Sequence, residues 1–314
     1  MITFSENKMN TPLVSVIIPN YCHAKYLDQR IQSVLNQTYQ NFEVIILDDC
    51  SPDDGASRAV IEKYRDNPHV SHIVYNETNS GSPFRQWHKG FQHAKGDVIW
   101  IAESDDYADR RFLETLMPCL LSHNNVSVAF CRSVLFNDEE GIIGQSGPAS
   151  INEGIIEGRR FIHDYMNTGT GIVNASSAIF RKSALNNCGN LYSSFRGAGD
   201  RMIWIELAEL GDVYFKETPY NYFRRHKNTT THRCNETGIN QIEDKRIFDY
   251  ICEKGYISKS EIPVYRDLYV RIHIFEMITD KKLKKELFKI WEYSIWKQLL
   301  LRMEYFIQKH KKHE

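Results

Sequence analysis

Three carboxylates within four residues stand out in the segment IWIAESDDYADRRF, at positions 99–112. An apolar run at 98–101 ends there, and Glu103, Asp105 and Asp106 follow it directly. Carboxylates this close repel one another, and burial makes each charge more costly. One interpretation is a turn leading into a helix, because Asp and Ser cap helices and acids suit the first turn. The other is a site for a divalent cation, which would offset the repulsion.

The elements around this segment follow the pattern of a parallel α/β sheet. Short runs rich in Val and Ile alternate with longer stretches in which apolar residues recur at helical spacing. The strands that we expect cover 14–18, 42–47, 72–75, 98–102 and 126–134. The intervening stretches, including 53–66 and 84–95, are then crossover helices that cover the sheet.

Polar segments follow four of these strands at the point where each strand ends. They are 19–21, 48–53, 79–81 and 103–106. In an open sheet of this kind, ligands bind beyond the carboxyl ends of the strands. Two of the four segments are acidic. Each alone is explained by a helix cap, but together, on adjacent crossovers, they favour a shared polar ligand.

Composition excludes several kinds of partner. The 314 residues include 39 basic and 40 acidic ones, so no overall charge favours nucleic acid. Seven cysteines without a CxxC pair indicate reduced thiols in a cytoplasmic protein rather than a zinc knuckle or a disulfide framework. The N-terminus lacks the apolar segment of a signal peptide, and no run of 18 apolar residues occurs. We therefore expect neither secretion nor a membrane-spanning helix.

Glycine-rich phosphate loops are absent from the sequence. The turn after the first expected strand reads PNYCHA where a dinucleotide-binding protein has GxGxxG, and no GxxxxGK[ST] motif occurs. A nucleotidyltransferase on a similar sheet would also need a basic, Gly-rich loop at this turn. Any phosphate bound here must therefore be neutralised by a metal ion or by side chains.

Five motifs, in order, resemble the inverting family 2 glycosyltransferases with the GT-A fold. They are VSVIIPNY, VIILDDCSPD, KGFQHAKGDVIWIAESDD, GAGDRMIWIELAELGDVYF and YNYFRRHKNTT. The resemblance covers about 12–231 and implies an α/β fold with a Rossmann-like mixed sheet flanked by helices. It implies a catalytic domain over 1–231, with a nucleotide-binding half at about 12–136 and an acceptor half at about 137–231. Residues 232–314 would form a helical C-terminal extension.

The resemblance assigns several residues to the donor nucleotide. Asp49 would accept a hydrogen bond from the imide of the nucleobase, which favours a UDP- or dTDP-sugar. Pro19 and Tyr21 would line the same pocket, and Asp105 would face the ribose. Arg85 would reach the nucleotide or the sugar.

A metal site is implied by the segment 104–106, which resembles the family's DxD motif with serine in place of the first aspartate. By this resemblance Asp106 binds Mn²⁺ or Mg²⁺, and His226 is the late histidine that completes the metal or diphosphate site. One or two carboxylates, with phosphate oxygens and water, are a ligand set that Mg²⁺ commonly takes. The basic neighbours suited to a diphosphate are Arg224, Arg225 and Lys227.

The implied reaction moves a sugar from a nucleotide-sugar to an acceptor hydroxyl with inversion. The metal would stabilise the departing diphosphate, and a carboxylate on the other face of the sugar would deprotonate the acceptor. Asp200 stands where the family often has a Glu-Asp pair, with Gly199 in place of the Glu, and is the expected catalytic base. A helix N-cap is the alternative role for Asp200, and the base would then be Glu206 or Glu103.

Two other functions remain open at this point. The chain could be a nucleotide-sugar-binding protein without catalysis, which the departure at Gly199 permits, or a nucleotidyltransferase. The presence of Asp49, Asp105, Asp106 and Asp200 together disfavours the first function. The missing Gly-rich loop disfavours the second.

The segment 281–314 carries ten Lys or Arg against four Glu, together with tryptophans and tyrosines. A basic amphipathic helix of this kind binds an anionic membrane surface. Packing on the catalytic domain or in a homodimer explains the same pattern. Because this family often uses lipid-linked acceptors, we expect a glycan or lipid-linked acceptor and peripheral attachment to the inner face of the membrane.

Overall fold

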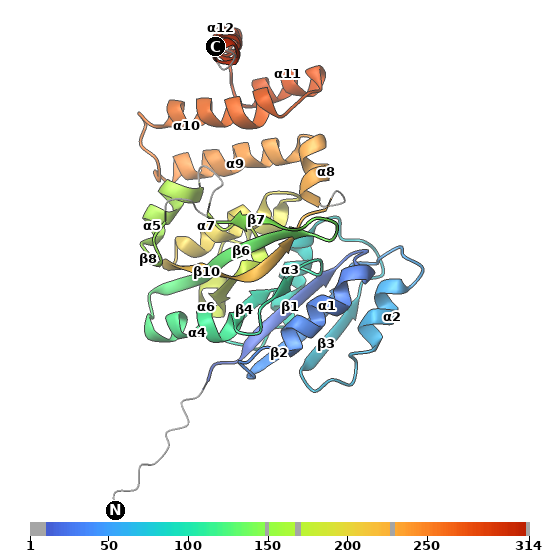
Figure 1. The fold of residues 1–314 in the computed structure, drawn as a ribbon. Helices are drawn as coiled ribbons and strands as arrows, with labels where there is room; N and C mark the ends of the chain where they lie inside the picture. The colour runs from blue at the N-terminus through green and yellow to red at the C-terminus, as the bar shows by residue number, and fades with distance from the viewer. Residues whose placement is uncertain (1–10, 148–150, 167–170, 227–229, 312–314) are drawn as a thin grey trace, which may run out of the picture.

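The computed structural model describes residues 11–147, 151–166, 171–226 and 230–311. Figure 1 shows a twisted sheet covered by helices, with the C-terminal helices stacked beyond one side of it. The strands are β1 (Val14–Asn20), β2 (Phe42–Asp48), β3 (Val70–Tyr75), β4 (Val98–Ile101), β5 (Tyr107–Ala108), β6 (Val126–Asn137), β7 (Gly141–Ser146), β8 (Gly154–Ile156), β9 (Ala178–Arg181) and β10 (Asp212–Arg224). All five strands expected from the sequence are present.

The α-helices follow the strands closely in the first half and dominate the last quarter of the chain. They are α1 (Ala24–Leu35), α2 (Ala56–Glu62), α3 (Pro83–His93), α4 (Phe112–Ser122), α5 (Gly158–Phe161), α6 (Lys182–Leu185), α7 (Gly199–Ala208), α8 (Thr230–Glu236), α9 (Ile239–Glu253), α10 (Ile262–Tyr269), α11 (Lys281–Ile290) and α12 (Ile295–Lys311). Short π-helical and 3₁₀ segments are η1 (Ile162–Met166), η2 (Ala175–Ser177), η3 (Leu191–Ser194) and η4 (Val270–Glu276).

The sheet is mixed, as the sequence predicts. Its main path runs β3-β2-β1-β4-β9-β6-β10-β5, with β7 paired to β6 and β8 to β10. Strands β1 to β4 are parallel, whereas β9 runs antiparallel between β4 and β6. Strand β10 is parallel to β6 and antiparallel to the short β5. This last pairing brings the end of β10 beside the segment that follows β4.

Strands β1 and β2 are buried along their whole length, because helices cover both faces of the parallel part of the sheet. Alternate side chains enter different cores. Ile17 and Ile45 join the core that contains α3, α7 and the C-terminal helices. Val16 and Val44 join the core under α1, α2 and α4. The period of two along each strand therefore divides the interior into two layers.

The C-terminal helices share a core with the catalytic half of the chain. Trp291 is fully buried, and its indole Nε1 donates to the Gln241 carbonyl at 2.9 Å. Its ring stacks on Tyr269 at 4.2 Å between centroids, and Phe248 packs against it. Residues of α9 to α11 therefore belong to the core that also holds α7.

Helix α12 carries an exposed apolar stripe. Its residues are Ile295, Trp296, Leu299, Leu300 and Met303, between 44% and 78% exposed. Their spacing places them on one side of the helix, while Leu301 faces inward and is buried. Among the helices of the described ranges, none combines the length and apolarity that crossing a bilayer requires.

Candidate active site

Two neighbouring cavities open at the carboxyl ends of β1, β2 and β4. The first cavity has a volume of about 360 Å³ and is lined by the residues that follow these strands, together with residues of α8 and α9. The second cavity, about 270 Å³, lies toward α7 and the end of β10. His23 and Glu103 line both, so the two spaces meet at the segment after β4.

Three of the residues expected at the nucleotide line the first cavity. They are Pro19, Tyr21 and Asp49. Arg85 does not reach it: the side chain is exposed at the start of α3, donates to the Ser80 carbonyl at 2.8 Å and lines neither cavity. The geometry therefore gives no support to a donor-binding role for Arg85.

The Asp49 carboxylate is buried and heavily hydrogen-bonded by the chain itself. Asn76, Gln86 and the Ser80 backbone N–H donate to its Oδ1 at 2.6–2.8 Å. The Ser80 hydroxyl and Asn79 donate to Oδ2 at 2.7 and 3.2 Å. Asp49 thus holds the loop after β3 in place, a role that the sequence did not suggest.

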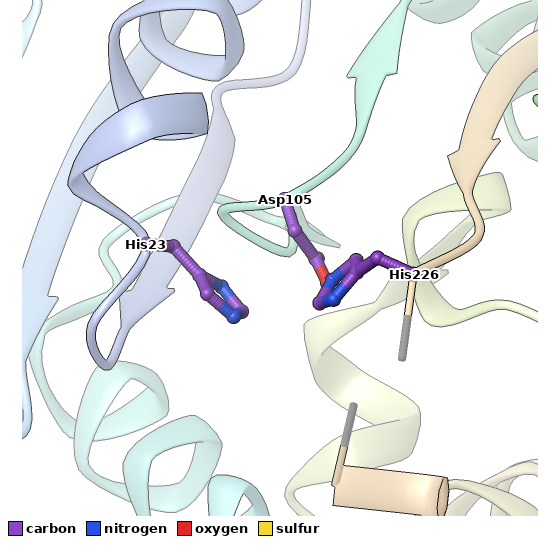
Figure 2. A group of neighbouring side chains, drawn as sticks. All are labelled: His23, Asp105 and His226. Carbon is purple, nitrogen blue, oxygen red and sulfur yellow. The ribbon is translucent and has the colours of Figure 1, made fainter. Parts of the chain in front are cut away.

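His23, Asp105 and His226 form a group suited to a metal ion (Figure 2). Their ligand atoms all lie within 4.8 Å of one another. His23 comes from the loop after β1, Asp105 from the loop after β4 and His226 from the end of β10, and their side chains point toward a common space. His226 Nε2 lies 3.0 Å from Asp105 Oδ2. All three residues line the second cavity.

The protonation states of His23 and Asp105 suit the binding of a cation. Burial lowers the pKa of His23, which keeps the imidazole neutral and able to bind a metal. Its Nδ1 lies 2.9 Å from the Ser104 hydroxyl, so Nε2 is the nitrogen left to face the cavity. Burial alone would raise the pKa of Asp105, but the hydrogen bond to His226 and the two imidazoles outweigh it and hold that pKa below its usual range. Asp105 is therefore ionised.

Asp106 lies elsewhere, and this corrects its expected place as the metal ligand. The side chain is 1% exposed and lines neither cavity. Asn174 and Ser176 donate to its Oδ2 at 2.9 and 2.7 Å, and the Arg224 backbone N–H donates to Oδ1 at 3.0 Å. Consecutive residues in an extended turn point to different sides, so only Asp105 of the pair faces the cavity.

Two buried arginines support the acidic segment from behind. Arg30 of α1 is fully buried, donates from Nε to the Glu103 carbonyl at 2.8 Å and lies 3.9 Å from the Asp106 carboxylate. Arg224 donates from Nε to the Asp105 carbonyl at 2.8 Å. These charges offset part of the clustered negative charge. Burial and the charge of Asp105 also raise the pKa of Glu103 to about 8, so Glu103 is protonated at neutral pH and repels its neighbours less. Arg225 lines the second cavity, and Lys227 lies outside the described residues.

Asp200 lines the second cavity together with Asp105 and His226. It sits in the first turn of α7, whose N-cap residue is Ala198, so Asp200 is not the helix cap. Its Oδ1 accepts the Arg201 backbone N–H at 2.7 Å. Burial raises the pKa of Asp200 to about 6, and the negative charge of Asp244 adds to the shift. A carboxylate with this pKa suits a general base near neutral pH.

The other two candidates for the base differ in position. Glu206 is buried on α7, accepts the backbone N–H groups of Leu191 and Tyr192, and lines neither cavity. Glu103 lines both cavities, and its Oε1 accepts the Trp87 indole N–H at 2.7 Å. Glu206 thus belongs to the core of the fold.

Gly199, the departure from the family's Glu-Asp pair, has a steric cause. A Cβ at this position would lie 2.5 Å from the Phe84 ring and 2.7 Å from the Tyr192 carbonyl. No side chain fits there without displacing a buried aromatic ring. The glycine therefore reflects the close approach of α3 to the start of α7.

Several cavity residues escaped the sequence analysis. His23, Arg196 and Arg233 line the first cavity, and Asn235 of α8 lines the second. His23 follows Tyr21 by two positions, which was an available signal. The others lie far along the chain, outside any motif whose spacing identifies a site.

The mixed sheet and its flanking helices form the GT-A fold, as expected from the sequence. The sequence matches the model of "Glycosyl transferase family 2" over residues 15–189, more than half of the chain. The protein therefore belongs to glycosyltransferase family 2.

Relatives with similar sequences are bacterial. An uncharacterized glycosyltransferase of Haemophilus influenzae is 37% identical over 127 residues, 39% of this chain and 50% of the relative. The putative teichuronic acid biosynthesis glycosyltransferase TuaG of Bacillus subtilis is 34% identical over 36% of this chain and 44% of its own length. These matches span about half of each relative or less. A second uncharacterized glycosyltransferase of H. influenzae is 25% identical over 96% of this chain and 92% of its own length.

Solved structures share the fold across nearly the whole chain. Staphylococcus aureus TarS 1–349 in complex with UDP has a TM-score of 0.59 at 16% identity, covering 94% of this chain and 91% of that one. The mannosyltransferase PcManGT of Pyrobaculum calidifontis, in complex with GDP-Man and Mn²⁺, has a TM-score of 0.58 at 14% identity, covering 95% and 81%. The structural similarity thus extends into the C-terminal region.

Proposed function

We propose that this glycosyltransferase moves a sugar from a nucleoside diphosphate sugar to an acceptor hydroxyl with inversion. The observation that carries the proposal is the second cavity, in which Asp105 and His226 share one space with Asp200. A group of side chains suited to a cation and a separate, half-buried carboxylate, next to a cavity of nucleotide size, are the parts that a metal-dependent inverting transfer needs.

The donor set at His23, Asp105 and His226 fits a divalent cation. Two imidazoles and one carboxylate suit a transition ion such as Mn²⁺ better than Mg²⁺, which prefers oxygen ligands. When bound, the ion would supply charge stabilisation for the diphosphate leaving group. The proposal thus replaces Asp106 by Asp105 as the protein's carboxylate ligand and keeps His226.

The chain's own residues supply the remaining chemistry. Asp200 takes the proton from the acceptor hydroxyl as that oxygen attacks the anomeric carbon, while the bond to the diphosphate breaks on the opposite face. Attack from the face opposite the leaving group inverts the configuration. Arg196 and Arg233, which line the first cavity, place positive charge near the donor and are suited to its phosphates.

A pyrimidine nucleotide is the proposed donor base. Asp49, Pro19 and Tyr21 line the first cavity, and the TarS structure with UDP supports such a donor by fold. The GDP-Man complex of PcManGT, which has an equally similar fold, is the competing precedent. Because Asp49 already accepts several hydrogen bonds from the chain, its effect on the base includes shaping the pocket wall.

The acceptor is proposed to be a glycan of the bacterial cell surface, or its lipid-linked precursor, at the inner face of the membrane. The name of TuaG, a teichuronic acid enzyme, supports this class. The apolar stripe of α12, beside the lysine-rich α11, supports peripheral contact with anionic lipid. Homodimer formation through the same stripe is the alternative.

A donor panel tests the proposed function. Purified protein is incubated with UDP-, dTDP- and GDP-sugars in Mn²⁺ or in EDTA, and release of the free nucleoside diphosphate is followed. We expect release from a UDP- or dTDP-sugar only with the metal. Binding without release, for every donor and with cell-envelope acceptors added, would indicate a nucleotide-sugar-binding protein. Release of pyrophosphate from a nucleoside triphosphate would indicate a nucleotidyltransferase.

A further inference from the structure

Two adjacent acids on α9, Glu243 and Asp244, hold opposite sides of the start of α7. Helix α9 belongs to the C-terminal extension, whereas α7 carries Asp200. Neither acid lines either cavity, and the proposed chemistry uses neither. Both are nevertheless withdrawn from solvent, with Glu243 6% exposed. Their contacts explain why the fold buries them.

Glu243 binds the chain just before α7. Its Oε1 accepts the Arg196 backbone N–H at 2.7 Å, and its Oε2 accepts those of Gly197 and Ala198 at 2.8 and 2.9 Å. Three successive N–H groups at the entry to a helix are donors that the helix itself does not satisfy. One carboxylate from another element therefore satisfies three backbone donors of the loop that leads into α7, whose N-cap residue Ala198 has no capping side chain.

Asp244 binds the other side of the same turn. Its Oδ1 accepts from Arg201 Nη1 at 2.7 Å, in an ion pair whose side chains are 12% and 15% exposed. Arg201 Nε donates in turn to the Met166 carbonyl at 2.7 Å. Arg201 directly follows Asp200, so this pair fixes the backbone next to the proposed base.

The C-terminal helices hold Asp244 in its position. The Tyr269 hydroxyl donates to Asp244 Oδ2. The Tyr269 ring stacks between Trp291, at 4.2 Å, and His273, at 4.5 Å. A continuous set of contacts therefore runs from the core of the extension to the first turn of α7.

The segment 196–199 packs closely against α9 on one side and α3 on the other. A Cβ on Gly197 would lie 1.9 Å from the Asn240 side chain of α9, and one on Gly199 would lie 2.5 Å from Phe84 of α3. The backbone is thus packed closely between α9 of the C-terminal extension and α3. The Asp200 carboxylate is held by a backbone N–H, that of Arg201, so its position follows the position of this backbone.

We propose that Glu243 and Asp244 are positioning residues for the catalytic base, so that the C-terminal extension sets the geometry of proton abstraction. The inference rests on the proposed role of Asp200. A displacement of about 1 Å at a reacting group costs about 10²-fold in rate. Removing either acid should therefore reduce turnover much more than it reduces donor binding.

The test uses the whole chain, four single variants, Asp200→Asn and the double variant that combines Asp200→Asn with Asp244→Asn. Asp244→Asn keeps the shape of the side chain and removes the ion pair. Glu243→Gln also keeps the shape, but it removes the charge and replaces one of the two acceptor oxygens by an NH2 group that cannot accept a backbone N–H. Asp249→Asn is the matched control, because Asp249 lies on the same helix and pairs with Lys245 near the surface. Arg201→Lys changes the other partner of the ion pair with Asp244. Turnover is measured as release of the nucleoside diphosphate from the donor that the panel selects. Binding is measured as the Kd of UDP with Mn²⁺.

We expect Asp244→Asn and Arg201→Lys each to lower turnover by about 10- to 100-fold with a Kd for UDP within about twofold of the parent, since the effect lies in orientation. Asp249→Asn should leave both unchanged. In an Asp200→Asn background, Asp244→Asn should cost nothing more, because both changes act through one group. A melting temperature for each variant confirms that it is folded.

Other results would overturn the proposal. If Asp244→Asn lowers turnover as much in the Asp200→Asn background as alone, Asp244 does not act through the base. Suppose that Asp244→Asn, Glu243→Gln and Arg201→Lys all fold and retain turnover while Asp200→Asn loses it. The positioning role of Glu243 and Asp244 is then wrong, and the assignment of Asp200 as the base stands. If Asp200→Asn itself retains turnover, the proposed function of Asp200 fails and the inference fails with it.

Discussion

His226 Nε2 lies 3.0 Å from Asp105 Oδ2, although the two residues are 121 positions apart. The antiparallel pairing of β10 with β5, which matches Tyr222 with Tyr107, accounts for this proximity. The pairing carries the residues after β10 past the acidic segment after β4. A histidine that follows the last strand of the sheet thus meets an aspartate that follows a central one.

We predict that Asp105, and not Asp106, controls metal dependence. Asp105→Asn should weaken Mn²⁺-dependent UDP binding by at least about tenfold, because an amide is a poor substitute for a charged oxygen ligand. Asp106→Asn should instead lower the melting temperature, since its carboxylate satisfies buried donors from Asn174, Ser176 and Arg224. Calorimetric titration and thermal unfolding measure the two effects. Loss of metal dependence in Asp106→Asn alone would restore the assignment made from the sequence.

We predict that Asp200→Asn separates binding from transfer. The amide keeps the shape and the hydrogen bond to the Arg201 N–H but cannot take a proton, so turnover should fall by about 10²- to 10⁴-fold. The Kd for UDP with Mn²⁺ should stay within about twofold of the parent, because Asp200 does not line the first cavity, which is the proposed nucleotide site. Glu206→Gln serves as a control from the same helix. Near-normal turnover in Asp200→Asn would direct the search for the base to Glu103.

The rate should fall at acid pH with an apparent pKa near 6. Burial, then the charge of Asp244, raise the pKa of Asp200 to about 6, while the Arg201 N–H opposes the shift. A base acts only when deprotonated, so kcat should be level above this pH and drop about tenfold per unit below it. The other titratable or charged side chains that line the same cavity are those of His23, Glu103, Asp105, Arg225 and His226. The acid limb should therefore be compared with that of Asp200→Asn at saturating Mn²⁺, where its persistence would assign it to another group.

We predict that Gly199→Ala destabilises the protein by about 1–3 kcal/mol, because overpacking of a filled core carries this cost. The added methyl group would meet the Phe84 ring at 2.5 Å. Denaturant unfolding measures the loss. Phe84→Leu in the same chain should recover part of it by making space beside the new carbon. Full stability in the single variant would show that α3 can move away from α7, and would contradict the close packing of Phe84 against Gly199.

The stripe on α12 should mediate binding to anionic vesicles. Trp296→Glu with Met303→Glu should abolish flotation with phosphatidylglycerol vesicles, because charged side chains oppose insertion at the interface. Ile142→Glu, at an exposed apolar position of β7, is the control and should float like the parent. Point variants are preferable to truncation near Lys281, since that cut would remove the buried Trp291. If the parent does not float but forms dimers that Trp296→Glu dissociates, the stripe is a protein interface.

The sequence by itself determined the order of the elements and the half of the first cavity that the strand ends supply. Strands such as β1 and β2 are continuous apolar runs because they are buried on both faces, and this local property is readable. Residues that directly follow such strands must lie at one edge of the sheet. Pro19, Tyr21, Asp49 and the acidic segment were therefore predictable from strand ends alone.

Only the tertiary structure decided which member of the acidic pair faces the cavity. Asp105 and Asp106 are adjacent, yet the Asp105 side chain faces the second cavity whereas the Asp106 side chain is buried. Arg224 fixes these two orientations, because its backbone N–H donates to the Asp106 carboxylate and its side chain donates to the Asp105 carbonyl. Contacts between residues so far apart in sequence leave no local pattern, so motif spacing alone could not assign the ligand.

The role of the C-terminal helices was equally hidden from the sequence. Their basic and aromatic content allowed either a helix on a membrane surface or packing on the catalytic domain. In the structure Trp291 and Tyr269 are buried and stack on each other, and the Tyr269 hydroxyl donates to Asp244. An amphipathic pattern specifies that one face is apolar but not what covers that face. Burial against α9 and α7 is a property of the packed chain, because it depends on surfaces that exist only once the sheet and its helices have assembled.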